Sequence, residues 1–130
     1  MSKLVNLIEY NDNVLTYFGT SIISKKCSET EANIQLYFDR NCDYLTNFSS
    51  DYMFIPEVIQ LYLASFIAKD IFNIECSSGQ FRKIKFLNLI KPNEILNLQL
   101  EYTPRGINYS YSDKEIIYSS GQLPIRNYWK

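Results

Sequence analysis

Hydrophobic and polar residues alternate over several short segments of the chain, which is the pattern of half-buried strands. The clearest case is residues 32–39, where Ile34, Leu36 and Phe38 alternate with residues of the opposite face. A turn at residues 28–31 is expected to join this strand to another over residues 20–26. Four further strands are predicted, over residues 81–89, 95–103, 106–112 and 115–123.

A helix is predicted over residues 56–72. Pro56 suits a first turn, Glu57 is favoured by the positive end of the helix dipole, and Lys69 lies near the negative end. Apolar residues cover most of the helix circumference instead of one stripe: Val58, Ile59, Leu61, Leu63, Phe66, Ile67, Ile71 and Phe72. We therefore expect a central helix that is enclosed by other structure.

Two strands, one helix and four more strands predict an α+β fold, in which one antiparallel sheet wraps around one helix. Residues 40–55 show no periodicity and are expected to form a long loop, and long ordered loops often carry function. Only four Gly and four Pro interrupt the sequence, and no linker or repeat divides it. The prediction is one domain over residues 1–130, with the first 19 residues unassigned.

Composition narrows the possible functions. The 130 residues carry a formal charge of −1 and contain no histidine, so a Ser-His-Asp or Cys-His pair and imidazole metal ligands are excluded. The three cysteines, Cys27, Cys42 and Cys76, lack the spacing of a zinc site or a disulfide framework and are expected to be incidental thiols. No metal or cofactor is expected, and the charge gives no broad surface for nucleic acid.

The first residues fail as a signal peptide, because Asn, Glu and Asp interrupt a short apolar patch. The longest apolar stretch, residues 52–68, is too short and too polar to span a bilayer. A cytoplasmic protein without a membrane anchor is expected.

Several short motifs occur in a recognisable order: Tyr44-Leu45-Thr46-Asn47-Phe48, Ile55-Pro56-Glu57-Val58-Ile59-Gln60-Leu61, Ile84-Lys85-Phe86-Leu87, Lys91-Pro92-Asn93-Glu94 and Ser120-Gly121-Gln122-Leu123. Across residues 44–123 the chain resembles the beta-hydroxyacyl-acyl-carrier-protein dehydratases, especially the small members tied to aryl-polyene-type lipid pathways. The resemblance implies a hotdog fold, fatty-acid or polyketide-type metabolism, and a homodimer or a heterodimer with a related hotdog subunit.

The resemblance also implies two catalytic positions that this chain does not fill. Asn47 stands where the family has a histidine base, and an amide has no usable basicity. Tyr62 stands at the position of the acid on the helix, and its alternative role is packing. Glu57 replaces a glycine that lets the thioester approach the backbone. Dehydration by the isolated chain is therefore not expected.

Other residues are candidates for binding or hydrolysis. Asp51 and Glu57 are carboxylates that could activate water, as in hotdog thioesterases, although the helix dipole is the favoured explanation of Glu57. Substrate-binding positions implied by the motifs are Phe48, Pro56, Val58 and Gln60. For Gln60 the alternative is a structural hydrogen bond to the preceding loop.

The prediction is thus a dehydratase-like protein without the usual catalytic pair, which acts as an acyl-thioester or carrier-protein binding subunit or as a partner of an active dehydratase. The expected partners are an acyl carrier protein or an acyl-CoA thioester. Two alternatives stay open: a thioesterase that uses Asp51 or Glu57, and a dehydratase whose catalytic groups come from a partner chain.

Overall fold

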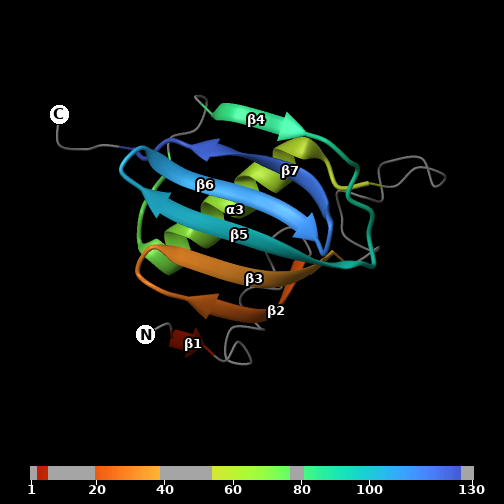
Figure 1. The fold of residues 1–130 in the computed structure, drawn as a ribbon, viewed down its shortest axis with the longest axis horizontal. Helices are drawn as coiled ribbons and strands as arrows, with labels where there is room; N and C mark the ends of the chain where they lie inside the picture. Colours follow the sequence, from red (N-terminus) through yellow and green to blue (C-terminus); the bar gives the residue numbers. More distant parts are fainter. Residues whose placement is uncertain (1–2, 6–19, 39–53, 77–80, 127–130) are drawn as a thin grey trace.

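The computed structural model describes residues 3–5, 20–38, 54–76 and 81–126 (Figure 1). Seven strands and one long helix are found in these ranges, in the order β1 (Lys3–Val5), β2 (Thr20–Cys27), β3 (Glu31–Phe38), α3 (Glu57–Phe72), β4 (Arg82–Phe86), β5 (Ile95–Thr103), β6 (Gly106–Asp113) and β7 (Ile116–Leu123). Of these elements, only the three-residue strand β1 was not predicted, because a segment so short has no detectable periodicity.

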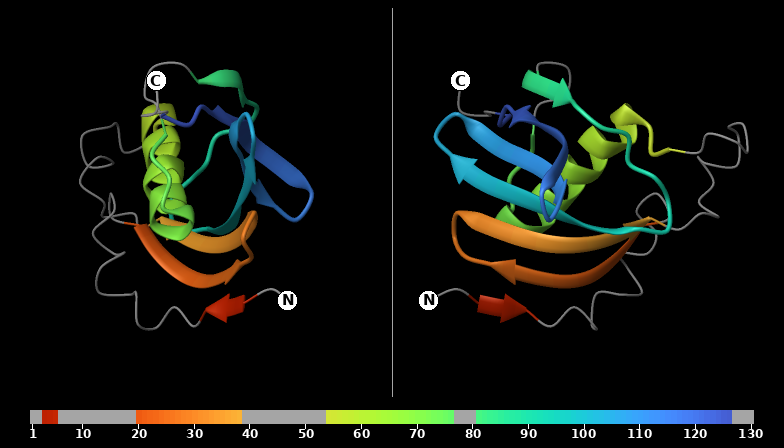
Figure 2. Two further views of the ribbon diagram at one scale, coloured as in Figure 1. Left: turned by 90° about the vertical axis from the view of Figure 1, so that its left-hand side faces the viewer. Right: turned by 45° about the vertical axis from the view of Figure 1, so that its right-hand side comes forward.

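The strands form one sheet in the order β1-β2-β3-β5-β6-β7-β4, and every neighbouring pair is antiparallel. The sheet curves around α3, which lies across its concave face (Figures 1 and 2). After β3 the chain passes through the helix to the far edge of the sheet, and it then returns to the centre as β5. The expected α+β hotdog architecture is confirmed.

Alternation along the central strands produces the core. On β3, the residues Ala32, Ile34, Leu36 and Phe38 are buried and the residues between them are more exposed. Strand β5 places Leu96, Leu98 and Leu100 directly opposite Leu36, Ile34 and Ala32, so both strands present one apolar face to the helix.

The helix contributes a stripe to this core at positions 60, 63, 64, 67 and 68. The expectation that it is enclosed is correct for this face only. Val58, Tyr62 and Phe66, spaced four residues apart on the other side, are 49%, 43% and 45% exposed. A sheet can cover one side of a helix, and an apolar pattern around the whole circumference does not say which side it covers.

Strand β4 is shorter than its predicted span of residues 81–89. After Phe86 the chain leaves the strand, and the backbone N–H groups of Leu87 and Asn88 both donate to the carbonyl of Tyr118, at 2.8 and 3.1 Å. The side-chain amide of Asn88 then donates to the carbonyl of Ile117 at 3.0 Å. These bonds hold residues 87–89 against β7 and turn the chain towards the start of the helix.

A bulge in β4 explains Gly121. Arg82 pairs with Gln122 and Lys85 with Ser120, so the two residues between them oppose Gly121 alone, and Lys83 adopts a φ of 55°. A Cβ on Gly121 would clash with the side chain of Ile84 and lie 2.9 Å from the ring of Tyr109. The glycine therefore leaves room for the extra residue to fold over β7.

Across the ranges that the structure describes, no helix combines the length and the apolar character that a membrane crossing requires.

Candidate functional site

The start of α3 presents backbone polar groups at the edge of the core. Pro56 precedes the helix in an extended conformation, and its carbonyl accepts hydrogen bonds from the N–H groups of Ile59 and Gln60, at 3.1 and 3.2 Å. No side chain caps this end. The amides of Glu57 and Val58 belong to the first turn, which has no intrahelical acceptors and carries a partial positive charge.

A cavity of about 110 Å³ lies beside this helix start. Its walls come from the segment before the helix, the first helical turn, and the chain that follows β4: Phe54, Ile55, Glu57, Gln60, Phe86, Leu87, Asn88 and Leu89. The N–H of Ile55 donates to the carbonyl of Ile90 at 2.7 Å, which ties the two wall segments together. Among the lining residues that the structure describes, Glu57 alone has a titratable side chain.

Gln60 is the centre of a buried network under the cavity. It is 2% exposed, and its side-chain amide donates to the carbonyl of Ile55 at 3.1 Å. Its side-chain oxygen accepts a hydrogen bond of 2.6 Å from the hydroxyl of Ser119, and its backbone carbonyl accepts one of 2.7 Å from the hydroxyl of Tyr111. Gln60 therefore joins the helix start to strands β6 and β7, and its side chain is committed to bonds within the protein.

Tyr109 lies next to this network on β6. The ring of Tyr109 packs edge-on against that of Tyr111, with the ring centroids 5.7 Å apart. Tyr109 as a whole is 2% exposed. Burial raises the pKa of the Tyr109 phenol to about 12; the hydroxyl of Ser119 lowers it in part, and the carboxylate of Glu57 raises it further. Ser119 donates its own proton to Gln60. Its oxygen lies near the Tyr109 hydroxyl, but that hydroxyl makes no hydrogen bond of normal geometry to any described residue.

The residues predicted for the site fall into three groups. Pro56 and Glu57 lie at the helix start, with Glu57 exposed at the cavity, and Gln60 lies beneath it. Val58 and Tyr62 lie on the exposed side of the helix, outside the cavity lining, so Tyr62 is not a core residue. Asn47, Phe48 and Asp51 lie outside the described residues.

The described cysteines do not act at this site. Cys27 and Cys76 are free, and Cys42 lies outside the described ranges. Burial raises the pKa of Cys76 to about 11, which the hydroxyl of Ser65 offsets in part, and burial also raises the pKa of Cys27 despite the nearby Lys25. Both therefore favour the unreactive thiol form. Among the described residues no cluster of metal-binding side chains occurs.

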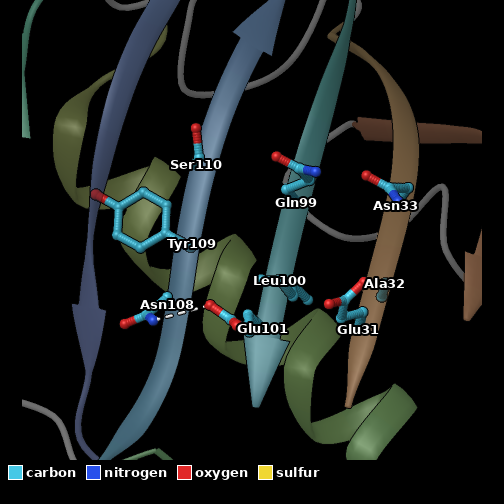
Figure 3. A pocket seen from close by; sticks show the side chains of 9 residues that line it. All are labelled: Glu31, Ala32, Asn33, Gln99, Leu100, Glu101, Asn108, Tyr109 and Ser110. Carbon is cyan, nitrogen blue, oxygen red and sulfur yellow. Dashed lines mark hydrogen bonds between the residues drawn. The ribbon is translucent and has the colours of Figure 1, made fainter. Parts of the chain in front are cut away.

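The convex face of the sheet carries a second type of hollow, of about 290 Å³. Figure 3 shows its side chains on β3, β5 and β6, where Asn108 donates a hydrogen bond of 3.1 Å to Glu101. Glu31 lies directly opposite Glu101 in the strand register. None of the predicted site residues that the structure describes lines this hollow.

Sequence reasoning missed Ser119, Tyr109 and Tyr111 as neighbours of the helix start. All three lie on strands more than forty residues away in sequence. Tyr109 and Tyr111 alternate with less buried residues like ordinary core positions, and Ser119 lies in a strand without regular alternation. The only available signal was the motif Ser120-Gly121, which adjoins Ser119.

Taken together, the helix start offers backbone amides that can hold a carbonyl oxygen, beside an apolar wall formed by Phe86, Leu87 and Leu89. The described part of the lining offers one carboxylate for proton transfer, that of Glu57. Such a site can hold a ligand oxygen at the amides and a small apolar group against the wall.

Comparison with known proteins agrees with the fold. Residues 24–122 match the ApeI-like family of ApeI dehydratases. The dehydratase heterocomplex ApeI:P from Xenorhabdus doucetiae is similar in structure, with a TM-score of 0.70 and 20% identity over 77% of this chain and 90% of that one. No curated protein matches the sequence.

Two other solved structures share the fold. An uncharacterized protein from Erwinia carotovora subsp. atroseptica has a TM-score of 0.59 and 22% identity over 82% of this chain and 91% of that one. The PaaI protein of the E. coli phenylacetic acid degradation operon has a TM-score of 0.61 and 12% identity over 92% of each chain. At these identities the likeness is one of fold.

Proposed function

The chain belongs to the ApeI-like dehydratase family, and we propose that it is a dehydratase-like subunit that binds an acyl thioester without supplying the catalytic pair. The thioester is carried by an acyl carrier protein or by coenzyme A. The setting is cytoplasmic lipid synthesis of the fatty-acid or polyketide type.

The observation that carries this proposal is the lining of the cavity at the helix start. Dehydration of a 3-hydroxyacyl thioester needs one group to remove the α-proton and another to protonate the leaving hydroxyl. Among the described residues of the lining one is titratable, Glu57, while Tyr62 lies on the exposed side of the helix. The cavity supports binding of a thioester carbonyl at the amide of Glu57 better than it supports this two-group reaction.

A heteromeric assembly is part of the proposal. One structural neighbour was solved as a dehydratase heterocomplex. A subunit that lacks the proton-transfer groups is useful when a second, related subunit supplies them, and the family membership makes such a partner a hotdog protein. A homodimer is the alternative assembly.

Hydrolysis of the thioester is the second candidate activity. It is favoured by one observation, the exposed Glu57 carboxylate at the edge of the cavity. A carboxylate in that place can activate water if it comes within hydrogen-bond reach of it, at about 2.6–3.2 Å. Asp51 is the other carboxylate proposed for this role.

The test measures dehydration, hydrolysis and binding on the purified chain. We expect no dehydration of 3-hydroxyacyl-pantetheine above the protein-free rate, and none after Asn47→His, because the helical acid is still missing. We expect Glu57→Gln and Asp51→Asn to leave hydrolysis of acyl-CoA at background. Robust dehydration by the unmodified chain contradicts the proposal. A clear hydrolase activity lost in one of the two carboxylate variants establishes the thioesterase instead.

Binding is measured by calorimetry with a hydrolysis-resistant acyl-CoA analogue. Leu87→Asp places a charge in the apolar wall and is expected to weaken binding by about tenfold or more. The matched control is Ile116→Asp, since Ile116 is similarly exposed, at 46% against 57% for Leu87, and lies outside the cavity lining. Equal effects of the two variants contradict binding in this cavity.

A further inference from the structure

The convex face of the sheet, which points away from α3, carries polar side chains in rows that cross the strands. The central row consists of residues paired in register on β2, β3, β5 and β6: Lys26, Asn33, Gln99 and Ser110. The rows on either side of it are Ser24-Gln35-Asn97-Ser112 and Glu31-Glu101-Asn108. On β3, β5 and β6 these residues alternate with buried ones, so their side chains leave the sheet on the side opposite the core.

Two hollows adjoin on this face. The first, of about 290 Å³, lies over β3, β5 and β6, and Figure 3 shows its side chains. The second, of about 390 Å³, is lined by Ser24, Lys26, Asn33, Gln35 and Asn97. Asn33 borders both hollows, and together they reach the range of about 300–1,000 Å³ that is typical of ligand sites.

The centre of this surface is formed by side chains that are available for bonding. A carboxamide offers both a donor and an acceptor, and those of Asn33 and Gln99 make no hydrogen bond to any other described residue. At the border, Asn108 is held by the hydrogen bond of 3.1 Å that it donates to Glu101. The border is therefore ordered, whereas the centre keeps its donors and acceptors for a ligand.

Solvation alone accounts for a polar sheet face, but it does not account for the residue types found on this one. Asn is depleted in strands, yet Asn33, Asn97 and Asn108 lie inside three adjacent strands. Thr, which combines a polar group with high β-propensity, is absent from the three rows. Residues that contradict local propensity are expected at functional sites, because their side chains serve another purpose there.

The charge and polarity of the rows define the ligand. Glu31 lies directly opposite Glu101, so a phosphate or a carboxylate is repelled at that end, while Lys26 contributes a donor at the other. The rows present no apolar side chain, so an acyl group gains nothing there. The uncharged donors and acceptors between the two ends match hydroxyl groups, which also donate and accept at once.

We propose that this face binds a neutral oligosaccharide in an extended conformation, which lies across the strands along the central row. Neighbouring strands lie about 4.7–4.9 Å apart, which is close to the repeat of one sugar unit in an extended β-1,4-linked chain. One unit then lies over each of β2, β3, β5 and β6, and Asn33 and Gln99 bond the hydroxyls of the middle two. The face lies on the opposite side of the sheet from the cavity at the helix start, so the inference is independent of the proposed function.

The test titrates the isotope-labelled chain with cellotetraose, a soluble extended probe, and follows the backbone amide signals by NMR. We expect the shifts to concentrate in residues 31–35, 97–101 and 108–112. The expected dissociation constant is on the order of 1 mM, because a shallow polar site loses much of its binding energy to desolvation and ordering. Maltotetraose has the same composition and length but a curved chain, and it is expected to bind at least about fivefold more weakly, as for one lost hydrogen bond.

The site is tested by Asn33→Ala combined with Gln99→Ala, which removes both central carboxamides and is expected to weaken cellotetraose binding at least about tenfold. Each single variant is expected to weaken it about threefold or more. Both residues are exposed, so the variants are expected to fold, which circular dichroism verifies. The control is Asn73→Gly, which removes an exposed carboxamide at the end of α3 and retains the left-handed backbone of residue 73, with its φ of 57°.

The control is expected to change the dissociation constant by less than about twofold. The proposal is overturned if cellotetraose causes no shifts at about 10 mM, or if both sugars bind equally well. Equal losses in the control and the double variant also overturn it, as do shifts at residues 57–60 in place of the convex face. Acyl binding is not measured in this titration, so either proposal can fail while the other stands.

Discussion

Gln60 is the residue whose replacement tests the described site most directly. We consider Gln60→Met, which keeps the length and flexibility of the side chain and removes both of its polar groups. The carbonyl of Ile55 then loses its donor at 3.1 Å, and the hydroxyl of Ser119 loses its acceptor at 2.6 Å. The backbone bond from Tyr111 is expected to remain, because it reaches the carbonyl of residue 60.

The magnitude follows from the two groups left without partners. A buried donor or acceptor that loses its hydrogen bond costs about 1–3 kcal/mol, and the added apolar surface of Met recovers part of this. The expected loss in the free energy of unfolding is about 2–4 kcal/mol, a large share of the roughly 5–15 kcal/mol that holds a domain folded. At about 3–5 °C per kcal/mol for a domain of this size, the Tm falls by about 6–20 °C.

Urea unfolding followed by circular dichroism measures this change, with Gln99→Met as the control because Gln99 is exposed on the convex face. The control is expected to stay within about 0.5 kcal/mol of the unmodified chain. A cycle with Ser119→Ala should give a coupling energy of about 1 kcal/mol or more, since both variants break the same bond. If Gln60→Met is no more destabilising than Gln99→Met, the network does not hold the helix start.

Two further predictions follow from neighbouring residues. Gly121→Ala is expected to cost about 1–3 kcal/mol in urea unfolding, because its Cβ meets Ile84 and Tyr109, whereas Ser120→Ala changes stability by less than about 0.5 kcal/mol; equal costs contradict the bulge. The pKa of Tyr109 is raised from 10.0 to about 12, so its neutral form stabilises the fold fully below pH 10 and this contribution is lost as the pH rises towards 12. Between pH 10 and pH 12 the free energy of unfolding of Tyr109→Phe should therefore fall by about 2 kcal/mol less than that of the unmodified chain. Parallel curves of unfolding free energy against pH for the two proteins refute this.

Much of the fold was determined by local features of the sequence. Strands β5 and β3 were predicted within one residue, because one face of each is buried and alternation reveals that face directly. The helix was predicted because Pro56 and Glu57 mark its start. The ordered motifs around these elements were sufficient for the hotdog fold and for the family, since both depend on residues that are close together in sequence.

Only the tertiary structure decided which side of the helix is covered and what surrounds its start. The apolar residues of α3 lie on all sides, so the sequence could not distinguish the buried Leu63 from the exposed Phe66. The bonds of Gln60 to Ser119 and Tyr111 span 59 and 51 residues. Such contacts depend on the register of strands that pair across the whole sheet, and no periodicity within a segment encodes that register.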